Sequence, residues 1–183
     1  MDVLTGEPLA LDLVNTRAST PAGDVDFLGT ADGLGVWLAR QSDRLGGLPQ
    51  PLTADGLAAV HRLRAHVEAA VTAVVAGQAP PAAAVAALNE AARAAPTHLF
   101  LGGSGVETRR DAAPLDRLLA ELAEAAITLL GTPGASRIRS CEAPGCRMLF
   151  LPAHPRRRWC SPELCGNRVR VARHYERARS GQA

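Results

Sequence analysis

Lysine is absent from this sequence of 183 residues, and aromatic residues make up only 3% of it. Because every strongly basic side chain is an arginine, the choice of arginine over lysine at any one position carries little information. Hydrophobic residues reach 47%, so with few aromatics the core has to be built mainly from Ala, Leu and Val. Alanine and leucine are good helix formers. This composition favours a mainly α-helical protein.

Long apolar runs are missing as well. No uninterrupted run approaches the ~20 residues that a membrane-spanning helix needs. Residues 1–4 lack the basic segment and the apolar run of a signal peptide. We therefore expect a soluble, cytoplasmic protein that does not bind a membrane.

Cysteine does not occur in the first 140 residues, and all four cysteines lie within the last 43. They form two pairs of equal spacing, Cys141-x4-Cys146 and Cys160-x4-Cys165. Two such pairs can supply the four thiolates of a tetrahedral structural zinc site. The spacing predicts Zn²⁺ as the cofactor of a small C-terminal module.

Other interpretations of the cysteines remain open. Two disulfides would need an oxidising compartment, and a redox dithiol usually has C-x-x-C spacing, which is absent here. Free buried thiols are the remaining alternative. His154 lies between the two pairs and is a substitute ligand in principle, but four cysteines already complete a tetrahedral shell. The zinc site is the favoured interpretation.

Charge is divided unevenly between the two parts of the chain. Residues 137–183 contain 11 arginines and three acids, a net charge of +8, whereas residues 1–136 carry a net charge of −6. A zinc ion with four thiolates would leave the C-terminal part near +6. A positive module attached to a negative domain indicates nucleic-acid contact by the module alone.

The N-terminal part has the pattern of a multihelical domain. Apolar residues at three- and four-residue steps, with capping residues and breakers, predict helices over residues 30–45, 53–77, 80–95 and 114–130. Residues 97–109 predict a β-hairpin with a glycine-rich turn. Residues 9–16 fit either a short strand or a first helical turn, and residues 17–29 indicate a turn-rich connection.

Gly and Pro residues at 131–136 predict a linker. It divides the chain into a multihelical domain over residues 1–130 and a finger over residues 137–183. In the finger we expect a turn at 141–146, a hairpin of residues 147–151 and 156–159, and a helix that starts at Ser161. Ser at the N-cap, Pro at the first position and an acid in the first turn favour that start. A turn, a hairpin and a ligand-bearing helix make a treble-clef-like zinc finger.

The last helix has two different faces. Leu164, Val171 and Tyr175 share one side of a helical wheel, and we expect this side to pack onto the hairpin. Arg170, Arg173 and Arg177 would then form an exposed ladder. A second basic cluster on the hairpin consists of Arg156, Arg157 and Arg158.

The guanidinium group of arginine can donate two parallel hydrogen bonds to phosphate oxygens, so both clusters are candidate nucleic-acid contacts. Charge compensation of the zinc–thiolate centre, a solvated helix face and contact with a protein are the alternatives. Trp159, next to Cys160, is expected to fill the core of the finger rather than to stack on a base.

The residues around the cysteines resemble a known family. Cys141 and Cys146, then Phe150, Arg157-Arg158-Trp159-Cys160-Ser161 and Cys165-Gly166-Asn167-Arg168 are similar to the CGNR zinc finger of bacterial proteins. Leu11-Asp12-Leu13-Val14-Asn15-Thr16, Trp37-Leu38 and Leu88-Asn89 resemble the all-helical ABATE-type domain that usually precedes that finger. Together the two resemblances span nearly the whole chain.

The resemblance implies a transcriptional regulator whose finger binds DNA and whose helical domain senses a ligand or mediates oligomerisation. It implies the same four zinc ligands, and it adds Asn167 and Arg168 to the expected DNA contacts. A small-molecule effector and a homodimer are further expected partners.

Two other classes of function are carried as alternatives. The first is a zinc-stabilised module that binds a protein and not DNA. The second is an enzyme with a pocket in the helical domain, near Asn15 and the glycine-rich hairpin. We find no catalytic constellation in the sequence, so we expect that the protein is not an enzyme.

Overall fold

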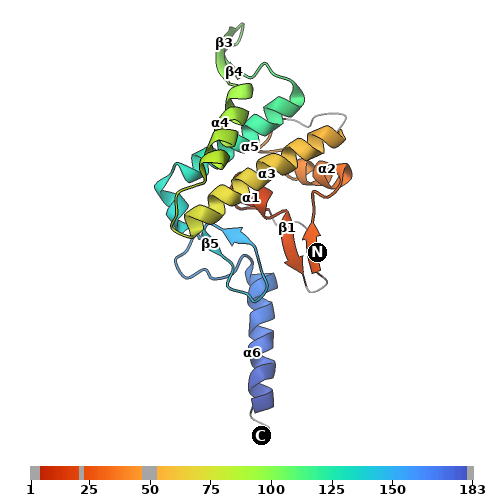
Figure 1. The fold of residues 1–183 in the computed structure, drawn as a ribbon, viewed down its shortest axis with the longest axis vertical. Helices are drawn as coiled ribbons and strands as arrows, with labels where there is room; N and C mark the ends of the chain where they lie inside the picture. The colour runs from red at the N-terminus through yellow and green to blue at the C-terminus, as the bar shows by residue number, and fades with distance from the viewer. Residues whose placement is uncertain (1–4, 21–22, 47–52, 181–183) are drawn as a thin grey trace.

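The computed structural model describes residues 5–20, 23–46 and 53–180. This part of the chain forms six α-helices and three two-stranded antiparallel sheets. Figure 1 shows an elongated molecule with the β3–β4 hairpin at one end, helix α6 at the other, and the remaining helices between them. The fold is mainly α, as the composition predicts. Among the described residues, no helix has both the length and the apolar character that crossing a membrane requires.

The main core lies among α3 (Ala54–Val75), α4 (Ala82–Ala94) and α5 (Pro114–Leu130). Thr53 caps α3 by accepting a hydrogen bond from the Gly56 N–H at 3.1 Å. Along α3 and α5, the side chains predicted to face inward are buried at three- and four-residue steps; they include Val60, Leu63, Val67, Val71, Leu118, Leu122, Ala126 and Leu129. Burying one such stripe against the others is what holds the three helices together.

Helix α1 (Leu9–Val14) settles the open choice for residues 9–16 in favour of a helix. Residues 10–14 are all buried, and α1 packs between α3 and α5. A helix that is covered on every side has no polar face. This explains why its sequence shows no clear helical period.

The turn-rich connection predicted for residues 17–29 is wrong for residues 17–20 and 23–26, which form the paired strands β1 (Arg17–Thr20) and β2 (Gly23–Asp26). Helix α2 (Ala31–Ala39) begins after the predicted N-cap Thr30, but it ends before Arg40 rather than near Leu45. The chain turns there because Gln41 and Arg44 both reach the buried carboxylate of Asp12.

The glycine-rich hairpin is confirmed as β3 (His98–Gly102) and β4 (Gly105–Arg109). Its Leu99, Leu101 and Val106 side chains are between 70% and 78% exposed. The segment predicted as a linker contains a short 3₁₀ helix, η1 (Pro133–Arg137). Ala135 and Ile138 belong to the main core. The segment that connects the helical domain to the finger is therefore packed against the helical domain.

The finger contains β5 (Arg139–Ser140), β6 (Leu149–Phe150), η2 (Pro162–Gly166) and α6 (Asn167–Ser180). The prediction that residues 147–151 pair with 156–159 is wrong, because β6 pairs with β5. Pro152 and Pro155, which have no N–H to donate, interrupt the segment after β6. The start at Ser161 is confirmed: its hydroxyl accepts a hydrogen bond from the Leu164 N–H.

A polar clasp joins the helical domain to the finger. The Asn15 side-chain amide donates to the Leu149 carbonyl at 2.8 Å and accepts from the Leu149 N–H at 2.9 Å, so it pairs with both backbone groups of one β6 residue. Glu7 accepts from the Leu151 N–H at 2.9 Å. A further contact is the ion pair between Glu68 of α3 and Arg147 of the finger, at 2.8 Å. These contacts fix β6, and with it the first cysteine pair, against α1 and α3.

Replacing Asn15 by alanine would leave the buried Leu149 N–H and carbonyl without partners. We expect this to cost about 2 kcal/mol of unfolding free energy, which corresponds to a fall of about 4–8 °C in the melting temperature. Differential scanning calorimetry measures it. Asn89→Ala, at an exposed position of α4, is the control and should change the melting temperature little. Equal melting temperatures for the two variants would refute the clasp.

Candidate metal centre and basic helix

Each cysteine is positioned by a different short element. Cys141 directly follows β5, and its N–H donates to the Met148 carbonyl at 2.9 Å. Cys146 ends a tight turn in which Gly145 has a φ of +70°, a conformation that glycine adopts readily. Cys160 precedes the Ser161 N-cap, and Cys165 lies inside η2. The turn and the start of the helix thus bring together two pairs that are far apart in sequence.

The four sulfur atoms form one cluster, all within 4.8 Å of one another. The Cys146–Cys160, Cys160–Cys165 and Cys146–Cys165 sulfur separations are 3.9, 3.5 and 3.7 Å. Sulfur atoms bound tetrahedrally at about 2.3 Å from a shared zinc ion would be about 3.8 Å apart. A disulfide needs about 2.05 Å, and all four cysteines are free. The arrangement fits a tetrahedral metal site and not two disulfides.

Proton affinities differ sharply within the cluster. A hydrogen bond from Cys160 lowers the pKa of Cys146 to about 5, although burial opposes the shift. Burial raises the pKa of Cys165 to about 11, and the hydrogen bond to Cys146 raises the pKa of Cys160. One thiolate therefore forms readily while its neighbours hold their protons. A divalent cation supplies the positive charge that allows all four thiols to ionise.

The surroundings of the sulfurs are also specific. The Cys160 N–H donates to the Cys141 sulfur at 3.3 Å, and the Arg168 guanidinium lies 3.6 Å from the Cys165 sulfur. Gly166 makes room for Trp159, since a Cβ on Gly166 would be only 3.0 Å from the Trp159 Cδ1 atom. Trp159 packs against the finger's small core, as predicted.

That small core joins finger residues to the helical domain. It contains Cys141, Ala143, Met148, Phe150, Cys165, Val169 and, from β1, Ala18. Val169 is the one residue of α6 that is buried. The predicted packing of Leu164, Val171 and Tyr175 onto the hairpin is wrong, because these side chains are 43%, 45% and 64% exposed. Helix α6 leaves the body after its first turn and projects into solvent (Figure 1).

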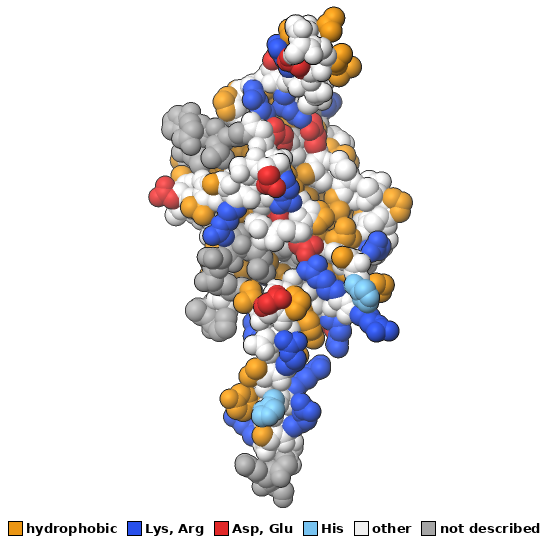
Figure 2. Space-filling view, turned by 180° about the vertical axis from the view of Figure 1, so that it is seen from behind, with side chains coloured by type: hydrophobic (Ala, Val, Ile, Leu, Met, Phe, Trp, Pro, Cys, Tyr) orange, Lys and Arg blue, Asp and Glu red, His pale blue; other side chains and the backbone are white. Residues whose placement is uncertain are grey.

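The predicted nucleic-acid contacts separate into two groups. The exposed ones are Asn167, Arg170, Arg173 and Arg177 on α6 and Arg156 in the loop before Cys160. Arg179, which the sequence analysis omitted, is exposed on the same helix. Figure 2 shows basic side chains along this projecting helix, most of them on one edge.

The remaining predicted contacts are engaged within the protein. Arg157 pairs with Glu7 at 2.6 Å, donates to the Cys160 carbonyl at 2.6 Å, and lies 4.5 Å above the Phe150 ring. Arg158 pairs with Glu142, and this contact lowers the pKa of Glu142. Arg168 donates to the Pro144 carbonyl at 3.3 Å. Arg157 in particular belongs to the clasp, because it connects Glu7 to the second cysteine pair.

A cleft of about 380 Å³ lies between the first cysteine turn and α6. It brings Arg158, Arg168 and Arg173 together around Trp159. Sequence reasoning did not place these residues together, because they come from a loop and from two turns of a helix. Glu142 and Glu176 also line the cleft, so its walls carry both signs of charge.

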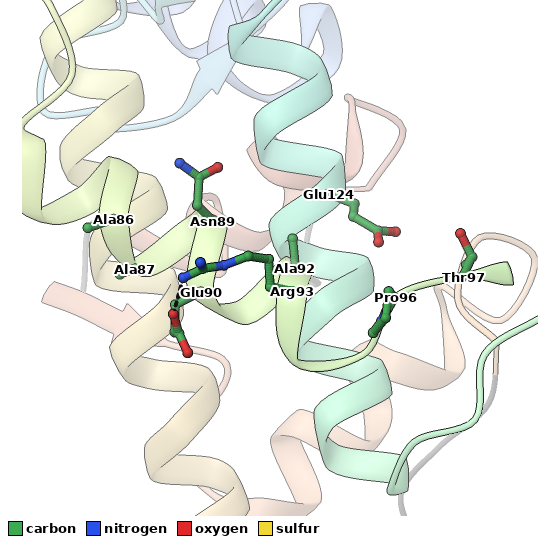
Figure 3. A pocket seen from close by; sticks show the side chains of 9 residues that line it. All are labelled: Ala86, Ala87, Asn89, Glu90, Ala92, Arg93, Pro96, Thr97 and Glu124. Atoms are coloured by element: carbon green, nitrogen blue, oxygen red, sulfur yellow. Dashed lines mark hydrogen bonds and ion pairs between the residues drawn. The ribbon is translucent and has the colours of Figure 1, made fainter.

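A larger depression of about 990 Å³ lies on the helical domain beside α4 and α5. Figure 3 shows the side chains that line it, which include three alanines and the polar Asn89, Glu90, Arg93, Thr97 and Glu124. Its Glu90 pairs with Arg93, and its Glu124 pairs with Arg110. Among its lining residues there is no cysteine, serine or histidine to act as a nucleophile or base beside a carboxylate. Asn15, expected near an enzyme pocket, is buried in the clasp and also lines a separate cleft of about 330 Å³, together with Glu7 and Arg157.

The fold and site therefore define a helical domain that carries a four-cysteine finger. Comparison with family models identifies both parts. Residues 7–133 match the ABATE family, described as "Putative stress-induced transcription regulator", and residues 137–178 match the CGNR zinc finger. The chain belongs to the ABATE family and has a C-terminal CGNR zinc finger, as its motifs indicate. No curated protein matches the chain.

Removing one thiol should abolish metal binding. For Cys146→Ser we expect the metal content to fall from about one equivalent to near zero, because three thiols bind zinc far more weakly than a closed four-thiolate shell. Elemental analysis of the purified protein measures this. Most of the helical circular dichroism signal should persist, since α3, α4 and α5 have their own core. A full metal complement in the variant would contradict the assignment.

Adding a Cβ at Gly166 should disturb the finger without touching the cysteines. In Gly166→Ala the new methyl would displace the Trp159 ring, which should cost about 1–3 kcal/mol, as overpacking does elsewhere. Thermal unfolding and tryptophan emission both report it. Gly103→Ala, where a Cβ meets open space, is the matched control. Unchanged tryptophan emission and unchanged stability in Gly166→Ala would show that the close packing of Trp159 on Gly166 does not stabilise the finger.

Proposed function

We propose that the protein is a zinc-dependent, DNA-binding transcription regulator whose finger contacts DNA. The observation that carries this proposal is the state of the arginines on α6. Within the described part of the chain, none of Arg168, Arg170, Arg173, Arg177 and Arg179 forms an ion pair with a carboxylate. Elsewhere many of the arginines pair with acids, as in Arg17–Glu68, Arg44–Asp12, Arg64–Asp26, Arg109–Glu107, Arg110–Glu124 and Arg147–Glu68.

Exposed arginines without a carboxylate partner, concentrated on one projecting helix, give that helix a strong positive potential. Five guanidinium groups along 14 residues of helix repel one another. DNA phosphates offer negative charge at regular spacing, and arginine binds them through paired hydrogen bonds. The family's description as a transcription regulator agrees with this chemistry.

Zinc has a structural role in this proposal. Cys165 lies two residues before Asn167, so a metal ion held by the four thiols fixes the position from which α6 starts. The ion would be bound by Cys141, Cys146, Cys160 and Cys165. The clasp through Glu7, Asn15 and Glu68 would then hold the finger at a constant position on the helical domain.

Titration of zinc-loaded protein with fluorescent duplex DNA over a series of salt concentrations tests the proposal. Each phosphate contact contributes about 0.9 to the slope of log affinity against log salt. For Arg170→Ala/Arg173→Ala/Arg177→Ala we expect the slope to fall by about 2.7 and the low-salt affinity to fall at least roughly tenfold.

The matched control removes the same charge from the helical domain, as Arg62→Ala/Arg93→Ala/Arg109→Ala. It should leave both the slope and the affinity close to those of the parent. Absence of DNA binding at low salt, or an equal effect of the two triple variants, would refute the proposal.

A protein-binding module is the second candidate. The exposed Leu99, Leu101 and Val106 of the β3–β4 hairpin favour it, because apolar side chains gathered on a projecting hairpin suit contact with another protein. The same titration separates the two functions, since a module of this kind would show no affinity for DNA at low salt. A small-molecule effector, a homodimer, a cytoplasmic location and the absence of enzymatic activity stay predictions.

A further inference from the structure

Val169 fixes the rotation of α6 about its axis. It is 8% exposed and packs in the small core with Phe150, Met148 and Cys165, while residues 170–180 are all exposed. Because the first turn of α6 is held in this way, the direction that each later side chain takes follows from helical geometry. A straight α-helix turns by about 100° per residue.

The face opposite Val169 is uncharged. Asn167, Val171 and Ala178 lie within about 20° of the direction opposite Val169. His174 lies about 40° from that direction on one side, and Tyr175 lies about 60° from it on the other. All five residues are exposed, Val171 at 45% and Tyr175 at 64%. The helix therefore presents a narrow strip of amide, aliphatic and aromatic groups, the outward strip, directly away from the protein.

Arginines border the outward strip on both sides. Arg170 and Arg177 lie about 80–100° from Val169 in one sense. Arg179 lies about 80° from it in the other sense, on the same side as Arg168, whose guanidinium is engaged with the Pro144 carbonyl. Arg173 lies about 40° from Val169, on the side that faces the protein. Figure 2 shows most of the basic side chains of this helix along one edge, with hydrophobic side chains on the other edge and fewer basic ones beside them. In their angles about the helix axis, the two arginine rows are nearly symmetric about the outward strip. A helix that only displayed one basic face to solvent would not have this arrangement.

This pattern matches the chemistry of the DNA major groove. The groove is about 12 Å wide and admits an α-helix, with phosphates on both walls and base edges on its floor. The 14 residues of α6 span about 21 Å, and the helix projects clear of the body (Figure 1). A side-chain amide can pair with adenine, an imidazole can donate or accept, and an aliphatic side chain can contact a thymine methyl group.

We propose that α6 enters the major groove with its outward strip toward the bases, so that Asn167, Val171 and His174 select the sequence. The arginine rows bind phosphates, one row on each strand. This inference rests on the proposed DNA-binding function and assigns the residues that determine specificity. A second copy of α6 is not the favoured occupant of the outward strip, because two such helices in contact would bring their arginine rows together.

The test begins with zinc-loaded full-length protein and a pool of random-sequence duplexes. Selection gives the preferred sequence, and binding constants for that duplex and for a scrambled one give a specificity ratio. For Asn167→Ala, Val171→Ala and His174→Ala we expect the ratio to fall, by roughly 5- to 100-fold for a lost amide–base pair. Affinity for the scrambled duplex and the salt slope should stay unchanged.

Substitutions in the arginine rows should have the opposite effect. Arg170→Gln and Arg179→Gln, one from each row, should each lower the salt slope by about 0.9. Each should weaken binding to the preferred and to the scrambled duplex by the same factor, so that the specificity ratio is preserved. Ala172→Ser, on the side of α6 that faces the protein, is the matched control and should change neither quantity. Metal content and thermal unfolding verify that every variant is folded.

The outcomes separate the inference from the function on which it rests. If the parent binds DNA through the arginines but the outward-strip variants keep the parent's base preference, the inference is overturned and the proposed function stands. If the parent binds no duplex at low salt, both are refuted. If Val171→Ala or Tyr175→Ala lowers the molecular mass in solution and leaves base preference unchanged, the strip is a protein contact and the inference fails.

Discussion

The convergence of four cysteine sulfurs is the constraint on which the C-terminal part of this protein depends. β5 and β6 are two residues long, the segment from Pro152 to Trp159 forms no strand, and η2 is a single turn. Elements of this size are not stable alone. Joining them at one centre replaces the large core that such a short segment cannot build. It also sets the origin of α6, because the last cysteine lies in the turn that leads into that helix.

Helix α1 provides the second constraint, through polar groups placed inside the core. Asp12 is fully buried and accepts hydrogen bonds from the Gly6 and Glu7 N–H groups while pairing with Arg44. Asn15 pairs with β6, and the Thr16 hydroxyl accepts from Arg64 at 2.9 Å. Buried polar groups are tolerated only when they are matched in this way. In consequence, three residues in or directly after α1, Asp12, Asn15 and Thr16, connect the N-terminal segment, the finger and Arg64 of α3 to one another.

Local signals predicted the long helices well. Thr53 and its helix, and the leucine stripe of α5, were recognisable because capping and three- to four-residue periodicity act within a few residues. Predictions failed where a distant contact decided the outcome. Helix α2 ends early because Gln41 and Arg44 turn toward Asp12. β6 pairs with β5 rather than with residues 156–159, and Arg157 turns inward to Glu7.

The sequence by itself determined the set of four cysteines, the helical character of the first domain and the concentration of positive charge at the C-terminus. These depend on spacing, composition and periodicity, which are properties of the chain alone. Only the tertiary structure decided which arginines pair with carboxylates and which face of α6 points outward. A helical wheel gives the positions of side chains relative to one another but not the rotation of the helix against the body. That rotation is set by the packing of Val169 on Phe150 and Cys165, a contact that no local pattern specifies.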